Sequence, residues 1–168
     1  MCIRDRPYPS PCHRLDSETA GCMIIAKTKS AQIRFNKLFT EKKIQKTYVA
    51  IVHGKVPLRG VINLPIAGQN AETIFERIEY KKSKSGEFYS QIKMYPRTGK
   101  THQLRIHLAC LGHPILGDKH YGRKGNILLH KGLFLCALQL CFHLGSCKVK
   151  VHTRDPSKFK RFLKLLDT

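Results

Sequence analysis

Positive charge dominates this sequence and restricts the ways in which it can fold. The 168 residues include 31 Lys and Arg against 11 Asp and Glu, which gives a formal net charge of +20 at pH 7. The basic residues recur between apolar segments instead of gathering in one tail, so a folded domain must carry them across its surface. A polyanionic partner relieves such self-repulsion, and the sequence therefore predicts contact with nucleic acid. A protein that is merely basic is the alternative.

Length and composition describe one globular domain. Hydrophobic residues make up 42% of the chain and charged residues 25%, which is enough apolar material for a core. No stretch approaches about 18 consecutive apolar residues, so we expect no transmembrane helix. Residues 1–12 lack the apolar segment of a secretory signal, and we expect a cytoplasmic protein.

The seven cysteines are an odd number and include no CxxC pair. Several lie within apolar runs, which is typical of buried free thiols in a reducing compartment. A zinc site is the alternative, and its ligands would be Cys136, Cys141 and Cys147 with His143 or His152. The spacing of these residues matches no standard zinc template, so we expect no metal.

Hydrophobic periodicity predicts a mixture of strands and helices. Strands are predicted over 22–26, 46–53, 60–66, 73–80 and 87–95, and two more within 133–152 around Gly145. Helices are predicted over 30–40 and 101–111, and from Pro156 onward with Asp155 as the N-cap. The run at 22–26 is expected to be buried, and 73–80 to form a hairpin with 87–95. Because no βαβ rhythm is present, the fold class is α+β.

Two aspartates stand in polar turns from which a scaffold can aim a carboxylate. Asp16 lies in the segment HRLDSETAG, and Asp118 ends the segment GHPILGD. For each, a turn residue that binds its own backbone is the structural alternative. Arg105 on the predicted helix is either a surface side chain or a fixed partner for an anion. The sequence has no Walker A, GxGxxG, HExxH or GxSxG motif, so ATP, nicotinamide and serine-hydrolase chemistry lack their parts.

Four motifs in a fixed order give these residues a family context. HRLD at 13–16 with TAG at 19–21, KTYVA at 46–50, TGKTHQLR at 98–105 and GHPILGD at 112–118 resemble the RluA-type pseudouridine synthases. The resemblance implies the pseudouridine synthase catalytic fold, a mixed, largely antiparallel sheet with flanking helices and an RNA-binding cleft. It also implies an enzyme that isomerises uridine in ribosomal or transfer RNA to pseudouridine, without cofactor or metal.

The resemblance also implies roles for individual residues. Asp16 is the expected catalytic carboxylate, Arg105 its partner, and Tyr48 the side chain beside the flipped base. Arg14 is expected to fill the gap that this base leaves. The other expected RNA-binding residues are His13, Lys100, Thr101, His102 and Gln103. The carboxylate can attack the anomeric carbon or remove the 2′ proton, and the sequence leaves both routes open.

The beginning of the chain departs from the family pattern. Relatives of this kind carry several dozen residues before HRLD, often after an S4-like RNA-binding domain, whereas twelve residues precede it here. We expect residues 1–12 to be a leader outside the native fold. Residues 13–168 are expected to form the catalytic domain without its N-terminal part. Lys100 replaces the usual Arg, which keeps the charge but loses the planar fork.

Two other functions fit the composition. A non-catalytic RNA-binding or ribosome-assembly protein has similar size and charge, and a metal nuclease has a use for the nine histidines. The nuclease lacks a cluster of carboxylate ligands. A binding protein has no need of a paired carboxylate, so Asp16 with Tyr48 and Arg105 distinguishes an enzyme from a binder. We expect RNA as the partner, a monomeric state and no membrane.

Overall fold

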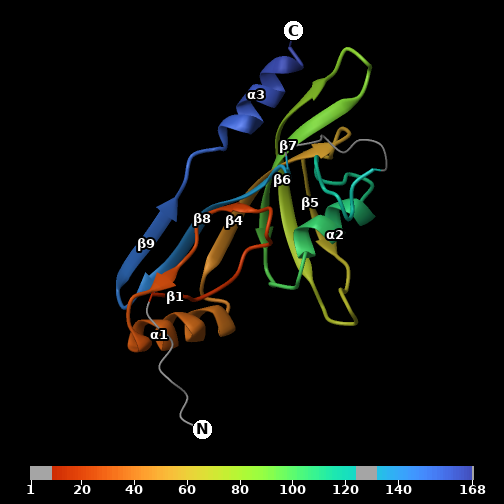
Figure 1. The fold of residues 1–168 in the computed structure, drawn as a ribbon. Helices are drawn as coiled ribbons and strands as arrows, with labels where there is room; N and C mark the ends of the chain where they lie inside the picture. The colour runs from red at the N-terminus through yellow and green to blue at the C-terminus, as the bar shows by residue number, and fades with distance from the viewer. Residues whose placement is uncertain (1–8, 124–131, 168) are drawn as a thin grey trace.

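The structure is a computed structural model that describes residues 9–123 and 132–167, and Figure 1 shows its fold. The helices in these residues are α1 (Lys29–Thr40), α2 (Gln103–Cys110) and α3 (Ser157–Leu165). The strands are β1 (Ser10–Pro11), β2 (Ala20–Gly21), β3 (Ile25–Ala26), β4 (Gln45–His53), β5 (Arg59–Asn63), β6 (Glu72–Lys82), β7 (Phe88–Pro96), β8 (Leu135–Leu144) and β9 (Cys147–His152).

Within the described residues, seven of these strands form one sheet. Its order is β2-β8-β4-β7-β6-β5, and β9 also pairs with β8. Because β4 occupies one edge of β8, β2 and β9 share the other edge, at residues 136–137 and 139–144 of β8. The pairing of β2 with β8 is parallel and the other pairings of this sheet are antiparallel. The expected α+β class with a largely antiparallel sheet is therefore confirmed.

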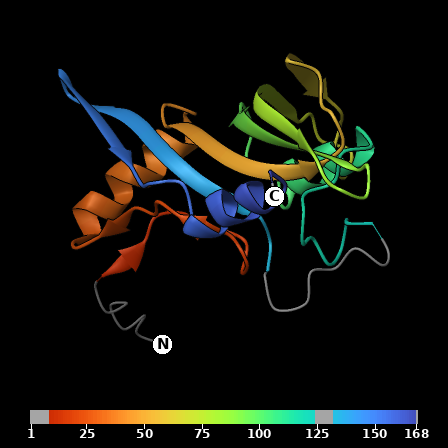
Figure 2. The same ribbon diagram turned by 90° about the horizontal axis from the view of Figure 1, so that it is seen from above.

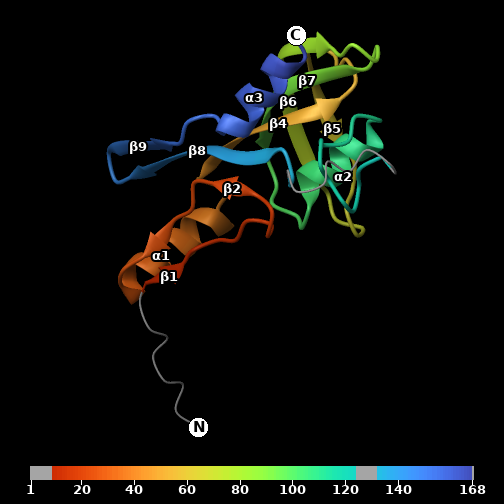
Figure 3. The same cartoon turned by 45° about the horizontal axis from the view of Figure 1, so that its top comes forward.

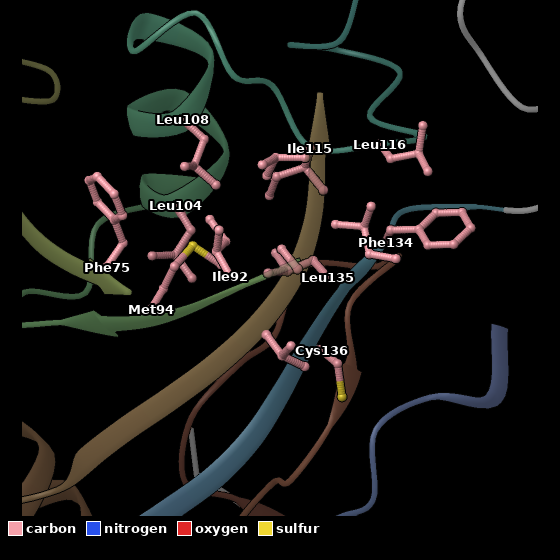
Figure 4. Close-up of a cluster of buried hydrophobic side chains, with 14 of the residues drawn as sticks. Phe75, Ile92, Met94, Leu104, Leu108, Ile115, Leu116, Phe134, Leu135 and Cys136 are labelled. Atoms are coloured by element: carbon pink, nitrogen blue, oxygen red, sulfur yellow. The ribbon is translucent and has the colours of Figure 1, made fainter. Parts of the chain in front are cut away.

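Two helices pack on opposite faces of the sheet, as the alternation of side chains along β7 shows. Ile92 and Met94 point toward α2 and join the core cluster that contains Leu104 (Figure 4). Tyr89, which is odd-numbered and points the other way, packs edge-on against Phe162 of α3, with ring centroids 5.1 Å apart. The sheet therefore separates an α2 face from an α3 face.

The far end of β8 has a smaller core of its own. Ile44, Leu140 and Phe142 are buried there, and Phe35 and Leu38 of α1 pack against them. These two side chains are three residues apart, as expected for one face of the helix predicted over 30–40. Figure 2 shows β4 and β8 side by side, with α1 near one end of them and α2 near the other, and Figure 3 shows the same separation.

The apolar run at 22–26 is not a buried strand, so that prediction was wrong. Only Ile25–Ala26 is extended as β3, and Met23 and Ile25 are 42% and 53% exposed. Cys22 and Ile24 pack against the smaller core beside α1 and Ala26 is buried, so alternate side chains of the run face inward. Met23 and Ile25 therefore point the other way, where solvent reaches them.

Part of the expected leader belongs to the fold. Ser10 is buried, pairs with Ala26, and accepts a 2.8 Å hydrogen bond from Gln32 of α1. The prediction that residues 1–12 lie outside the fold is therefore wrong for Ser10 and Pro11. Residues 1–8 lie outside the described residues.

The two later helices differ slightly from their predicted ends. Pro156, not Asp155, occupies the N-cap of α3, and no side chain caps this helix. Asp155 instead accepts a hydrogen bond from Gln91 at 3.4 Å, which takes its carboxylate away from the helix. Helix α2 is shorter than the predicted 101–111, and Leu111 beyond its end is 39% exposed.

Candidate active site

Asp16 lies in a loop, residues 12–21, that is fastened at both ends. At its start, the Cys12 amide donates to the Ile24 carbonyl at 2.9 Å. At its end, Gly21 has a φ of +129°, and a Cβ there would clash with the carbonyl oxygen of Ala137 on β8. A glycine is therefore required for this close approach. We call residues 12–21 the Asp16 loop.

His13 fixes the course of the Asp16 loop from inside. Its Nε2 accepts a 3.0 Å hydrogen bond from the Ile24 amide, and its ring lies 4.7 Å from that of Phe39. Burial first, and then the positive charge of Lys46, hold the pKa of His13 below its ordinary value. The acceptor nitrogen of this neutral imidazole is thus occupied within the fold, where it positions the loop, and the RNA contact expected for His13 stays a prediction.

Arg105 lies between two carboxylates. Its Nε and Nη2 donate to the two oxygens of Asp118, each at 2.8 Å, and its Nη1 lies 3.7 Å from Oδ2 of Asp16. Arg105 is 4% exposed, so the guanidinium is a fixed group and not a surface side chain. The expected approach of Arg105 to Asp16 is present, but Asp118 is its closer partner.

Asp118 holds a turn as well as the guanidinium. Its Oδ1 accepts from the backbone amides of His120 and Tyr121 at 2.9 and 3.0 Å. Burial alone would raise the pKa of Asp118, but the bonds from Arg105 and from these two amides hold it below its ordinary value. The turn-fixing role that the sequence allowed for Asp118 is present. We call residues 112–122 the Asp118 turn.

His102 is a third group beside Asp16. Its Nε2 lies 3.9 Å from Oδ1 of Asp16, and its Nδ1 is 3.0 Å from the hydroxyl of Tyr121. The backbone of His102 is left-handed, with φ 54°, at the N-cap of α2. A non-glycine residue held in this conformation stores strain, which is common where a side chain must be aimed.

Tyr48 enters the site from the middle of the sheet. The pairing of β4 with β8 shifts between Thr47 and Tyr48, from Thr47 opposite Gln139 to Tyr48 opposite Ala137. Such bulges redirect side chains and are frequent next to active sites. Burial, and then the negative charge of Asp16, raise the pKa of Tyr48 to about 12, so its phenol is neutral at physiological pH.

Asp16 and Tyr48 line one groove of about 990 Å3 together with basic residues. Lys46 is among them, and its Nζ donates to the Thr98 carbonyl at 3.3 Å while burial lowers its pKa. The other basic side chains of the groove are Arg14, Lys42, Arg97 and Lys100. This groove is wide enough for a nucleotide and carries the charge that phosphates require. We call it the catalytic groove.

The expected RNA-binding residues divide into two groups. Arg14 and Thr101 are exposed and joined across the groove by a 3.3 Å hydrogen bond, and Lys100 reaches Gln69 at 2.6 Å. Gln103, in contrast, is 4% exposed. Its amide donates to the Glu72 carbonyl and to Thr73 and accepts from Thr98 and Lys100. Gln103 therefore holds residues 98–100 in place, and its expected contact with RNA stays a prediction.

Lys46 and Tyr121 were assigned no role from the sequence, and Asp118 was left as either a turn residue or a candidate carboxylate. Lys46 and Tyr121 lie within or beside the motifs, as does Asp118, so position in the motifs was the available signal. The sequence did not reveal their contacts. Lys46 donates to the Thr98 carbonyl, the Tyr121 hydroxyl contacts His102, and Asp118 binds Arg105.

The cysteines bear on the prediction of buried free thiols. In the described residues six cysteines are unpaired, and Cys136 and Cys141 are buried as predicted.

No three His, Cys, Asp or Glu side chains of residues 9–123 and 132–167 lie close enough together to form a metal site. Nor does that part of the chain contain a helix long and apolar enough to cross a membrane.

The site therefore combines a carboxylate 3.7 Å from a buried guanidinium with a neutral tyrosine, in a groove lined by basic residues, which is an arrangement suited to a polyanionic ligand. Residues 3–110 match the family model for RNA pseudouridylate synthase. The chain thus belongs to the RNA pseudouridylate synthase family, whose members isomerise uridine in RNA.

Characterised relatives and solved structures agree with this membership. The dual-specificity RNA pseudouridine synthase RluA of Yersinia pestis is 32% identical over 92% of this chain and 81% of its own length. RluA of Escherichia coli is 36% identical over 70% of this chain, which spans only 59% of that protein. The structure of human RNA pseudouridylate synthase domain containing 1 matches with a TM-score of 0.80 and 29% identity, over 89% of this chain and 70% of that one.

Proposed function

We propose that this chain converts uridine in RNA to pseudouridine and that Asp16 is the reacting carboxylate. The observation that carries the proposal is the placement of Asp16, 3.7 Å from the buried guanidinium of Arg105 in a groove that Tyr48 also lines. Ribosomal or transfer RNA is the proposed substrate. The description of the Yersinia pestis relative as dual-specificity supports more than one RNA target.

The reaction breaks the bond between the sugar C1′ and the base N1, turns the base over, and joins C1′ to C5. Asp16 either attacks C1′ or removes the 2′ proton, and both routes require its carboxylate anion. Arg105 supplies positive charge beside that anion, and because Asp118 holds it by two bonds, this charge does not move during the reaction. At the end, C5 loses its proton and N1, released from the sugar, gains one, and on the second route the 2′ proton returns to the sugar, so the product is an isomer of the substrate.

Tyr48 serves the base and not the sugar. A flat aromatic face beside the uracil limits where the detached base can turn. Because its pKa is raised to about 12, the phenol remains protonated and acts through its hydroxyl as a neutral group that relays a proton, not as a phenolate base. The target nucleotide must leave its stack to reach this position, at a cost of a few kcal/mol. Arg14, an exposed residue of the catalytic groove, fills the gap in this proposal.

The test is tritium release from RNA labelled at C5 of uridine. Asp16→Asn keeps the shape of the side chain but not its anion, so we expect release to disappear while RNA affinity remains, because phosphate contacts dominate affinity. Glu18→Gln is the matched control. This variant also removes a carboxylate from the Asp16 loop. The carboxylate of Glu18 accepts a 2.8 Å hydrogen bond from Lys119, and Glu18 does not line the catalytic groove.

Normal release by Asp16→Asn would remove Asp16 from the reaction. The absence of release from both the wild type and the variant, with RNA binding intact, would favour a non-catalytic RNA-binding protein. Equal losses in Asp16→Asn and Glu18→Gln would show that the loop tolerates no change in charge, and would withdraw the specific role of Asp16.

A further inference from the structure

A second groove, of about 660 Å3, lies on the face of the sheet opposite Tyr48. Tyr48 pairs with Met94, which points toward α2, so the adjacent Lys93 points to the other face. Lys93 and Gln91 line this second groove, and Leu163 of α3 lines its wall. The catalytic groove and the second groove are therefore on different faces over most of the sheet.

Positive charge prevails in this second groove, which we call the lysine groove. Its basic residues are Lys81, Lys93, Lys150, Lys160 and Lys164, with His152 beside them. Three carboxylates also line it, but Asp167 is paired with Lys81 and Asp155 accepts from Gln91, which leaves Glu79.

Three of these lysines are available to a ligand. Lys150, Lys160 and Lys164 are exposed, and the ion pairs of the described residues do not include them. Lys150 comes from β9 and the other two from α3, so two separate elements aim their charges at one depression. Phosphate groups in a row are the ligand that such spaced ammonium groups fit.

The two grooves meet at one residue. Gln139 lines both of them, because the pairing of β4 with β7 ends at Tyr48 and leaves the sheet open beside Thr47. Thr47, Gln139 and His152 are register partners across β4, β8 and β9. They form a polar stripe that leads from the catalytic groove to the lysine groove.

We propose that the lysine groove binds the phosphate backbone of the RNA that flanks the target nucleotide. The strand leaves the catalytic groove past Thr47 and Gln139 and meets Lys150, Lys160 and Lys164 on the α3 face. The proposal rests on the proposed function for the identity of its ligand. It adds that RNA is held on both faces of the sheet, so the length of RNA beyond the reacting uridine contributes to affinity.

The test compares two triple variants with equal loss of charge. Lys150→Gln, Lys160→Gln and Lys164→Gln are combined in one protein, and Lys27→Gln, Lys29→Gln and Lys84→Gln in the control. The control lysines are also exposed but line neither groove. Binding is measured at several salt concentrations with a short uridine-containing RNA that fills only the catalytic groove, and with the same RNA extended on both sides. Phosphate contacts are independent of sequence, so the natural target is not needed.

With the extended RNA, we expect the lysine-groove variant to have a log–log salt slope shallower by about 2 to 3, at about 0.7 to 0.9 for each lost contact. With the short RNA it should match the wild type, as should its rate of tritium release at saturating RNA. A wild-type slope with the extended RNA would overturn the proposal. Equal losses in the control variant, or with the short RNA, would overturn it too.

This outcome is separable from that of the proposed function. If the wild type binds RNA but releases no tritium, the isomerase proposal fails while the comparison of salt slopes still decides the lysine groove. If tritium release is normal and the slope is unchanged, the lysine groove alone is rejected.

Discussion

Asp16 and Asp118 face the same guanidinium, yet the fold treats them differently. The carboxyl of Asp118 is fully buried, accepts two 2.8 Å bonds from Arg105 and two more from backbone amides. That of Asp16 is 19% exposed and lies 3.7 Å from Arg105 and 3.9 Å from His102. The oxygens of Asp118 are occupied by these four hydrogen bonds, whereas the side-chain oxygens of Asp16 have only the two longer contacts and are available for the proposed reaction.

The difference indicates a division of labour around Arg105. The Asp118 turn anchors the guanidinium, so Arg105 does not depend on Asp16 for its position. Asp16 in turn depends on the fastenings of its own loop, chiefly Gly21 against Ala137 and His13 against Ile24. In the proposed reaction the Asp16 carboxylate changes its charge or its bonding. Because Asp118 holds the guanidinium, Arg105 keeps its position during that change.

The largest effect on stability is expected from Asp118→Asn. Removal of the charged partner from a buried, two-bond ion pair leaves Arg105 with only the longer contact to the partly exposed Asp16, and we expect a cost of about 3–5 kcal/mol in the free energy of unfolding. Asp16→Asn should cost less than about 1 kcal/mol, because its pairing is long and partly exposed. Urea unfolding of both variants measures the difference.

Equal destabilisation of the two variants would contradict the distinction between Asp118 and Asp16, because Asp16 would then be a structural anchor too. The distinction would also be contradicted if Asp118→Asn kept full stability and full activity, because the Asp118 turn would then not be what holds Arg105.

Gly21→Ala should have a smaller effect, directed at the Asp16 loop. The new Cβ meets the Ala137 carbonyl in a conformation that L residues avoid, so we expect a cost of about 1–3 kcal/mol and a lower rate of tritium release. Gly86→Ala is the control, because Gly86 also has a positive φ but has open space around it. It should lose stability through backbone strain alone and keep the wild-type rate.

If Gly21→Ala reacts at the wild-type rate, the attachment of the loop to β8 does not position Asp16. If Gly86→Ala slows the reaction as much, the effect is one of general stability and the fastening of the Asp16 loop has no specific role.

Local patterns in the sequence predicted most of the strands and α1, because β4, the hairpin of β6 and β7, and the pair of β8 and β9 each carry their own periodicity. The run at 22–26 was misjudged because the fold covers only the side that carries Cys22, Ile24 and Ala26, and five consecutive apolar residues do not show which side is covered. Motif resemblance brought Asp16, Tyr48 and Arg105 to one site. It did not reveal the internal hydrogen bonds of residues such as His13 and Gln103, because these bonds depend on the folded backbone.

The smallest effect is expected for the pKa of Tyr48, which the negative charge of Asp16 helps to raise. The ordinary pKa of tyrosine is 10.0 and that of Tyr48 is about 12, so its neutral form stabilises the fold fully below pH 10 and this stabilisation is lost as the pH rises toward 12. Tyr89 is also raised to about 12, by burial and by its bond to Glu87, so subtraction of a Tyr48→Phe titration isolates Tyr48. Phenolate absorbance followed against pH measures both groups.

Because burial is the larger cause, Asp16→Asn should lower the pKa of Tyr48 only part of the way toward 10.0 and should leave the pKa of Tyr89 unchanged. Asp118→Asn, in contrast, should leave the pKa values of both tyrosines unchanged. A Tyr48 that titrates at its ordinary value in the wild type would place its phenol in water and away from Asp16, and the comparison of the two aspartates would lose its link to the base-binding side of the site.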